Sequence, residues 1–524
     1  MEDYQQQDQR DQSGDAVSVT IGIDRSTNSA TIHPALPEVK DCLRYAFRYW
    51  EQAAPPINKQ TGKPSYHKVP GKRRLKVDYR DLFAEMEDGG VITHCGMVSS
   101  IKKTLEELSI PYLENFTGEW PSPVITKEVG EGLREEQIEA VSHLIAAASY
   151  GGGMVEAATG IGKTRIIASI IKAYKDYKIA VVTKSVSVIR GLHSNLSELL
   201  AASGIREPIG ICYAREKTVR KVTIATLGTV EYLEPDEIDV LIVDECHTTA
   251  GDSMANKVLM FTKALRFGVS GTISNRFDGK ERLLEAMYGP IVFTVTDDRA
   301  EKLGRVCPLN VYFLKVDDGP DLSGCSDITR NRRGIWSNKY RNNLVKEVCD
   351  LAPDDQQLLI FVSTIKHLEE LQKLLPNISV CHGELSNEER KRVEEDFVSG
   401  KTKRLISTDC LSTGIDPKQL MIMIDASAIK GDSAMPQKRG RLRRWADGKT
   451  HGVLVNFADN WDPSLSRRAI NRVKDYQNRG DNVIMNALPS DIRFVESNPE
   501  NKNTENENGM DMDLGDEVLS TDQK

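Results

Sequence analysis

The chain has 524 residues, of which 39% are hydrophobic and 28% are charged, with a formal net charge of −8. At about 150 residues per domain, this length predicts three or four compact units and excludes a small single-module protein. The sequence holds no run of about 18 apolar residues, which argues against a membrane-spanning chain.

The negative charge is concentrated at the two ends. Residues 498–524 hold eight acidic and two basic residues, and residues 1–16 hold five acidic residues and one basic residue. Residues 17–497 therefore carry a net charge of about +2, so the composition does not exclude a polyanionic partner. We expect both acidic ends to be disordered. The polar N-terminal segment contains no signal peptide, which predicts a cytoplasmic protein of a bacterium or phage-infected host, or a nuclear one in a eukaryote.

The N-terminal part of the chain predicts a small α/β unit. Residues 17–24 and 29–32 have the pattern of short strands, and residues 38–52 and 97–108 have the pattern of helices. The most basic stretch of the chain, residues 59–80, lies between these helices and holds eight basic residues and one acidic residue.

From residue 131 onward, helices alternate with short apolar strands, a pattern typical of parallel sheets covered on both faces. The first series of predicted strands covers residues 154–156, 179–183, 223–226, 240–244 and 268–270. The second covers residues 358–362, 379–381, 404–407, 421–424 and 453–457. The sequence therefore predicts an α/β fold with acidic disordered ends at 1–16 and 498–524, a small unit at 17–120, parallel-sheet domains at 125–300 and 341–490, and a connector at 301–340.

A glycine-rich segment lies between a predicted strand and a predicted helix, which is the position that a phosphate-binding loop requires. Backbone N–H groups and the start of a helix can approach phosphate oxygens there. Lys163 is expected to reach the β- and γ-phosphates of ATP, and the Thr164 hydroxyl is expected to bind Mg²⁺. The predicted loop consists of Ala157, Ala158, Thr159, Gly160, Ile161, Gly162, Lys163 and Thr164.

Two further segments complete the predicted ATP site. The apolar strand at 240–243 ends in Asp244 and Glu245, at the strand end where open α/β sheets bind ligands. Asp244 is expected to hold Mg²⁺, and Glu245 to orient and deprotonate the attacking water. In the second domain, residues 437–444 hold five Lys or Arg residues, of which Arg441 and Arg444 are predicted to stabilise the transferring phosphoryl group.

These elements, in this order and spacing, resemble the motifs of superfamily 2 helicases and translocases over about residues 130–460. The resemblance implies two RecA-like domains that clamp ATP between them. Within the superfamily, the pattern is most similar to the XPB and phage UvsW type of DNA motor. That similarity rests on a DECH box at 244–247, motif III at 270–272 and the core of motif VI at 440–443.

The resemblance also assigns roles by position in the sequence. It implies ATP contacts for Arg134, Gln137 and Asp416. It implies that ATP hydrolysis is coupled to movement through His247, Ser270, Thr272 and Gln437. It implies nucleic-acid contacts for Lys184, Thr226, Ser363, Thr408 and Thr413. The N-terminal unit resembles, more weakly, a small DNA-binding domain of the phage proteins, and this likeness rests on Lys72, Arg73 and Arg74.

The predicted function is an ATP-hydrolysing motor that moves along DNA with little sequence preference. The phage resemblance implies unwinding, annealing or branch migration of recombination and replication intermediates. An RNA helicase is the first alternative, although His247 stands where DEAD-box RNA helicases have Asp. A non-catalytic, nucleotide-gated nucleic-acid clamp and the motor subunit of a restriction system are the others.

Overall fold

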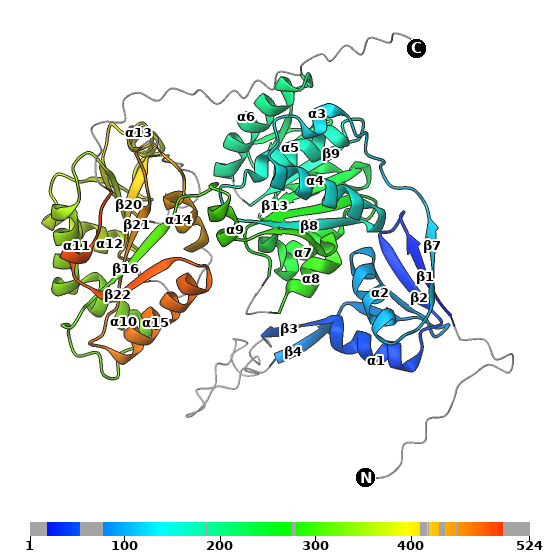
Figure 1. The fold of residues 1–524 in the computed structure, drawn as a ribbon, viewed down its shortest axis with the longest axis horizontal. Helices are drawn as coiled ribbons and strands as arrows, with labels where there is room; N and C mark the ends of the chain where they lie inside the picture. The colour runs from blue at the N-terminus through cyan, green and yellow to red at the C-terminus, as the bar shows by residue number, and fades with distance from the viewer. Residues whose placement is uncertain are drawn as a thin grey trace, which may run out of the picture.

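The computed structural model describes residues 18–52, 77–184, 186–274, 279–408, 417, 419–428, 435–446 and 448–495. It contains three main sheets, one in an N-terminal unit and one in each of two domains that follow it along the chain (Figure 1). In the part of the chain that is described, no helix combines the length and apolar character that crossing a membrane requires.

The N-terminal unit is a mixed sheet with two helices and a separate two-stranded ribbon. The sheet order is β5-β6-β2-β1-β7, in which β1 and β7 are parallel and the other pairs are antiparallel. Its elements are β1 (Val19–Asp24), β2 (Ser29–His33), α1 (Pro37–Ala46), β3 (Arg48–Gln52), β4 (Val77–Asp81), β5 (Phe83–Glu85), β6 (Val91–His94), α2 (Val98–Glu107) and β7 (Tyr112–Thr117).

The predicted helix over residues 38–52 is wrong in its second half. The helix ends at Ala46, and residues 48–52 form β3, which pairs with β4 to make the ribbon. Tyr49 and Trp50 stand opposite Arg80 and Tyr79 in that pairing. Aromatic residues favour strands, and a strand partner supplied from residues 77–81 outweighs the local helical spacing.

The first domain contains an eight-stranded sheet of order β11-β10-β12-β9-β13-β14-β8-β15, in which only the β10-β11 pair is antiparallel. The elements are α3 (Lys127–Gly130), α4 (Glu135–Ala147), β8 (Gly152–Ala157), α5 (Lys163–Ala173), β9 (Ile179–Thr183), α6 (Val186–Ala202), β10 (Gly210–Tyr213), β11 (Glu216–Thr218), β12 (Val222–Thr226), β13 (Val240–Asp244), α7 (Asp252–Leu259), β14 (Leu265–Ser270), α8 (Glu281–Tyr288), β15 (Ile291–Val295) and α9 (Asp297–Lys302).

Two apolar layers cover this sheet, as its strand composition predicts. Val181 and Ile242 face a cluster that also includes buried residues of the N-terminal unit, whereas Val182 and Val243 face the opposite cluster. Successive side chains of a strand point to opposite faces, so a central strand buried on both faces is apolar throughout.

The second domain contains a seven-stranded parallel sheet of order β18-β19-β17-β20-β21-β16-β22. The elements are β16 (Leu309–Leu314), α10 (Asp327–Asn331), α11 (Lys339–Leu351), β17 (Gln357–Phe361), α12 (Ile365–Leu374), β18 (Ser379–Cys381), α13 (Asn387–Val398), β19 (Arg404–Ser407), β20 (Leu420–Asp425), α14 (Met435–Leu442), β21 (Gly452–Phe457), α15 (Pro463–Asn478) and β22 (Asn482–Ala487).

The predicted connector over residues 301–340 is wrong in part, because β16 belongs to the second sheet. It lies between β21 and β22, and Val311 and Phe313 are fully buried. The structure therefore begins the second domain near residue 309, about 30 residues before the predicted boundary. A capping box begins α13, because Ser386 and Glu389 each bond to the other's backbone N–H.

Candidate functional site

The phosphate-binding loop joins β8 to α5. Gly160 and Gly162 have φ values of 96° and 87°, a left-handed conformation that favours glycine. A Cβ on Gly162 would lie 2.6 Å from Nε2 of Gln137, so the loop packs directly against that side chain. Gln137 is fully buried, donates to the Ile161 carbonyl (2.6 Å) and accepts from the Arg134 N–H (2.9 Å). The two residues predicted to contact ATP before the loop are thus beside it.

An acidic pair lies at the end of β13, the strand two places from β8 in the sheet, with Asp244 as its last residue. Glu245 has φ 54°, an uncommon conformation for a residue other than glycine, and such conformations cluster at functional sites. Its Oε1 lies 3.9 Å from Nζ of Lys163, and the Lys163 ammonium also lies 3.5 Å from the Ala157 carbonyl oxygen. The loop lysine and the predicted catalytic base therefore face each other.

Ser270 links the acidic pair to motif III. Its hydroxyl donates to Oε2 of Glu245 (3.2 Å), lies 2.7 Å from Nδ1 of His247 and accepts from the Thr272 N–H (3.2 Å). Three of the residues predicted to couple hydrolysis to movement, His247, Ser270 and Thr272, are therefore joined to Glu245 in one network.

The two carboxyl groups of the acidic pair have opposite pKa shifts. Burial opposes the ionisation of Glu245, but the charges of Lys163 and His247 and the hydrogen bonds from His247 and Ser270 outweigh it and lower its pKa to about 2. Burial, with the adjacent Glu245 carboxylate, raises the pKa of Asp244 to about 6. Glu245 is thus ionised at neutral pH, while Asp244 is a carboxyl group that a nearby cation would further stabilise in its charged form.

Glu156, near the end of β8, is a site residue that no sequence motif predicted. Its Oε1 accepts from the backbone N–H groups of Ile273 (2.6 Å) and Ser274 (3.0 Å), so it holds the segment that follows motif III. The one feature of the sequence that could have indicated Glu156 is its charge within an otherwise apolar strand, between Val155 and Ala157.

The second domain reaches the phosphate-binding loop through α14. A Cβ on Gly440 would lie 2.4 Å from Cγ2 and 2.7 Å from Cβ of Thr159, so the helix backbone packs against the loop. Arg441 is 9% exposed, and burial lowers its pKa to about 10; burial also lowers the pKa of Arg444. The structure therefore brings the segment with the predicted arginines to the loop with Lys163.

Two of the residues predicted to contact nucleic acid meet in a groove of the first domain. Lys184 and Thr226 line a groove of about 540 Å³, together with Thr248, which follows the DECH box. Ser363 and Thr408 do not line it. Both lie in the second domain, where Ser363 donates to the Ser427 carbonyl (3.0 Å).

Several predicted residues lie outside the described part of the chain. They are Lys72, Arg73, Arg74, Thr413 and Asp416. Gln437 lies in α14, but its side chain is not described.

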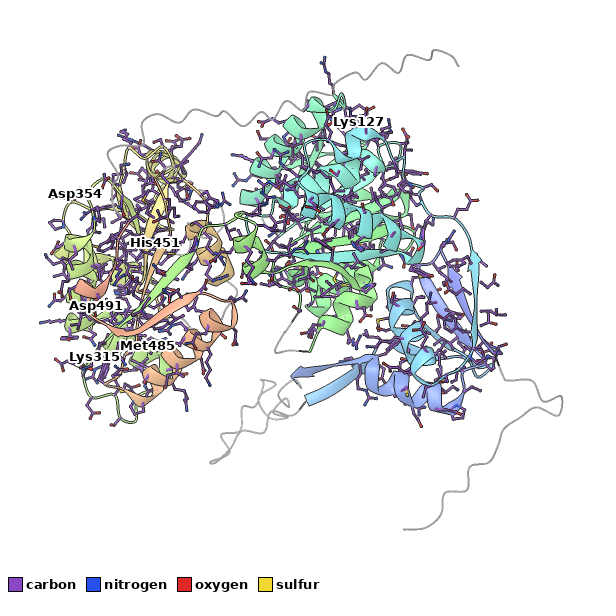
Figure 2. All side chains as sticks on the ribbon, in the orientation of Figure 1. Lys127, Lys315, Asp354, His451, Met485 and Asp491 are labelled. Atoms are coloured by element: carbon purple, nitrogen blue, oxygen red, sulfur yellow. The ribbon has the colours of Figure 1, made fainter. Side chains whose placement is uncertain are left out.

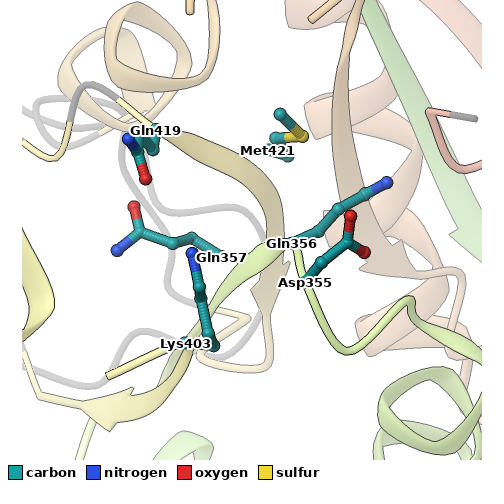
Figure 3. A pocket seen from close by; sticks show the side chains of 6 residues that line it. All are labelled: Asp355, Gln356, Gln357, Lys403, Gln419 and Met421. Carbon is teal, nitrogen blue, oxygen red and sulfur yellow. The ribbon is translucent and has the colours of Figure 1, made fainter. Parts of the chain in front are cut away.

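A second pocket, of about 200 Å³, lies at the amino ends of β17, β19 and β20 (Figure 3). Gln357, Lys403 and Gln419 point toward one another there. The neighbouring Asp354 lies on the side of the second domain that faces away from the first (Figure 2). Because nucleotide-binding loops follow the carboxyl ends of parallel strands, this pocket is separate from the candidate site.

Two segments of the chain match known protein families. Residues 131–275 match the family described as type III restriction enzyme, res subunit, and residues 341–446 match the helicase conserved C-terminal domain. The two segments contain the phosphate-binding loop and DECH box, and motif VI, respectively.

Individual proteins show lower or more local similarity. A candidate helicase of Sulfolobus islandicus filamentous virus is 21% identical over 392 residues, covering 67% of this chain and 68% of that protein. The ATP-dependent RNA helicase eIF4A of Saccharomyces cerevisiae is 31% identical over 203 residues, covering 38% of this chain and 48% of the relative. The chain thus spans about half the length of that relative. The crystal structure of T4 UvsW aligns with 90% of this chain and 99% of its own, at 16% identity and a TM-score of 0.36.

Proposed function

Because the chain belongs to the superfamily 2 helicases and is an ATP-hydrolysing enzyme of that family, we propose that it is a motor that moves along DNA. Its proposed substrates are branched or duplex intermediates of recombination and replication, which it unwinds, anneals or branch-migrates. The resemblance to XPB and phage UvsW supports DNA as the substrate and the cytoplasm of a bacterium or infected host as the setting.

One observation carries the proposal, namely the packing of Gly440 against Thr159. It supports a site with two sides, in which the phosphate-binding loop belongs to the first domain and the arginines of motif VI to the second. Hydrolysis in such a site can change how the domains grip a ligand, because the bound triphosphate contacts both.

The first domain supplies the groups that bind and orient ATP. Lys163 would neutralise the β- and γ-phosphates, while the backbone N–H groups of the loop and the start of α5 would donate to phosphate oxygens. The carboxylate of Asp244 and the hydroxyl of Thr164 are oxygen ligands of the type that Mg²⁺ prefers, and burial of Asp244 without full charge compensation fits a cation there. Bound Mg²⁺ would supply positive charge at the β- and γ-phosphates.

Hydrolysis depends on a base that is ionised and oriented. The lowered pKa of Glu245 keeps it ionised at neutral pH, and Ser270 and Lys163 fix the direction of its carboxylate. Glu245 would orient the attacking water and accept its proton. Arg441 and Arg444 would stabilise the charge that develops on the transferring phosphoryl group.

Movement would result from alternating grips on the phosphate backbone. Lys184 and Thr226 would hold it in the first domain, and Ser363, Thr408 and Thr413 in the second. The network from Glu245 through Ser270 to Thr272 would couple the state of the nucleotide to the groove. Thr248, which follows the DECH box, lines that groove. Such contacts carry little sequence information.

An RNA helicase is the second candidate. The similarity to a protein named as an ATP-dependent RNA helicase favours it, because that alignment reaches 31% identity. The two functions share their ATP chemistry and differ in contacts to the 2′-hydroxyl.

The test compares ATP turnover by the full chain with duplex DNA, single-stranded DNA and RNA of equal length, at two salt concentrations. We expect DNA to stimulate turnover at least tenfold more than RNA. Stimulation by RNA alone would replace the first proposal with the second. Nucleotide binding without turnover on any nucleic acid would favour a clamp. Strand displacement on forked, four-way and simple duplex DNA would then identify the preferred structure.

A further inference from the structure

Two arginines of the motif VI segment have no part in the proposed phosphoryl contacts. Arg439 and Arg443 are each 2% exposed, and they lie four residues apart, so they project from one side of the helical turn. Arg439 Nη1 donates to Oδ2 of Asp297 (2.6 Å). Arg443 donates through Nη2 to Glu301 and lies 3.7 Å from Oδ1 of Asp297. Both acidic residues are on α9.

Helix α9 is fixed to the first domain. Ala300, on its buried side, belongs to the apolar core shared by the N-terminal unit and the first sheet. Arg299 and Arg305 pair with Glu139 (3.1 Å) and Glu136 (2.7 Å) of α4. Because Glu136 is 2% exposed, its pairing with Arg305 is shielded from solvent. The acidic residues of α9 therefore move with the phosphate-binding loop.

Helix α14 is fixed to the second domain. Lys438 pairs with Asp425 at the end of β20 (3.2 Å), and Asp481 accepts from Nη2 of Arg439 (2.5 Å). Arg439 therefore bridges an acid of each domain, Asp297 and Asp481. Figure 1 shows α9 between the two sheets, next to α14.

Backbone contacts continue the same junction beyond the end of α14. The Cys307 N–H donates to the Arg443 carbonyl (2.8 Å), and the Trp445 indole donates to the Gly304 carbonyl (3.0 Å). Gly440, which packs against Thr159, and Arg441 lie between the two bridging arginines in the sequence. A shift of Arg439 and Arg443 would therefore shift Arg441 as well.

We propose that Asp297, Glu301, Arg439 and Arg443 form a clasp that holds motif VI against the phosphate-binding loop, with Asp297 and Glu301 as positioning residues for ATP hydrolysis. The inference rests on the proposed function of the same site. The clasp touches no substrate and acts through the placement of Arg441 and Arg444. The clasp therefore affects the transition state of hydrolysis, which Arg441 and Arg444 stabilise, and not the binding of ATP.

The test replaces Asp297 with Asn and uses Asp298→Asn as the matched control. Asp298 neighbours Asp297 on α9 and has the same charge, but its side chain is 65% exposed and pairs with Lys302 (2.7 Å). We expect Asp297→Asn to lower nucleic-acid-stimulated kcat about tenfold and to change the KM for ATP less than threefold, because the loop that binds ATP is intact. Asp297→Glu should recover most of the lost kcat, and Asp298→Asn should match the wild type.

Glu301→Gln supplies a second variant should Asp297→Asn fail to fold, because Glu301 is 38% exposed at the rim of the clasp. Its expected loss of kcat is about threefold, since Arg443 keeps its approach to Asp297. Turnover of both variants equal to that of Asp298→Asn would overturn the clasp. A rise in KM equal to the fall in kcat/KM would also overturn it, because the residues would then act on ATP binding alone.

A measurement without ATP separates this inference from the proposed function. Small-angle X-ray scattering of the full chain should give a larger radius of gyration for Asp297→Asn than for Asp298→Asn, because the domains separate more often. Identical scattering would contradict the clasp even if DNA-stimulated turnover is found. Altered scattering in a protein without turnover would support the clasp and contradict the proposed motor.

Discussion

The first domain meets its two neighbours through junctions of different chemistry. Its junction with the N-terminal unit is a continuous apolar core, in which Cys95, Met97 and Val155 belong to one buried cluster. Its junction with the second domain consists of ion pairs, hydrogen bonds to the carbonyls of Arg443 and Gly304, and the close approach of Gly440 to Thr159. Apolar packing resists separation, whereas charged groups that come apart can be solvated by water or paired with a charged ligand. The first junction is therefore harder to separate than the second, which fits the proposed motor, in which the second junction opens and closes.

The largest expected effect comes from a substitution that stops ATP hydrolysis but still allows ATP to bind at the second junction. Glu245→Gln should lower nucleic-acid-stimulated turnover about 10²- to 10³-fold, because the amide cannot accept a proton from water. Binding of ATP, measured with a fluorescent analogue, should change little. Glu237→Gln is the control, since Glu237 lies on the surface of the same domain and pairs with Lys178. Turnover within threefold of the wild type would remove Glu245 from its role.

The next effect comes from preventing the close approach at the second junction. Gly440→Ala should lower turnover about tenfold or more, because the added Cβ would lie 2.4 Å from Thr159. Alanine favours a helix over glycine, so the thermal stability of the chain should not fall. Gly191→Ala in α6, where a Cβ would meet nothing within 4 Å, is the control and should leave turnover unchanged. Loss of stability with turnover retained would contradict the expectation.

A matching substitution tests the first junction. In Gly96→Ala the Cβ would lie 2.1 Å from the Glu285 carbonyl oxygen of α8. The clashing atom belongs to the backbone, so the clash cannot be relieved by rotating a side chain. We expect the free energy of unfolding to fall by about 1–3 kcal/mol, measured by denaturant titration. Gly130→Ala, which has open space around it, should be neutral. Equal stability of both variants would show that this junction is looser than its contacts suggest.

The smallest effect concerns the pH dependence of the first junction. Burial, with the charge of Arg266, lowers the pKa of His94 to about 4 from its usual 6.5. The unfolded chain therefore binds a proton between pH 6.5 and pH 4 that the folded chain does not, so stability is complete above pH 6.5 and falls as the pH drops. We expect a loss of up to about 2 kcal/mol near pH 5, from about 1.5 pH units at about 1.4 kcal/mol each. His94→Gln should flatten the difference in stability between pH 7 and pH 5, and an unchanged slope would exclude His94.

The local sequence was sufficient to predict where the loops assigned to the ATP site lie between strands and helices. The glycine-rich turn with Lys163 and the acidic end of β13 each depend on a few consecutive residues, and the predicted strands β9, β13 and β19 match the structure at both ends. Residues that local patterns could not assign depend on distant partners. Strand β3 requires β4, and the pairing of Arg439 with Asp297 joins residues 142 positions apart. Arg439 is buried where the two domains meet, which no local pattern of the sequence indicates.

The place of β16 in the second sheet has a consequence for the order in which the chain folds during synthesis. This first strand of the second domain is flanked by β21 and β22, which end at Phe457 and Ala487. The ribosome must therefore release about 170 further residues before β16 has neighbours on both sides, since its partners are that distant along the chain. The N-terminal unit and the first domain can fold long before then. We therefore expect a nascent chain in which these parts are folded while the apolar strand Leu309–Leu314 is still unpaired.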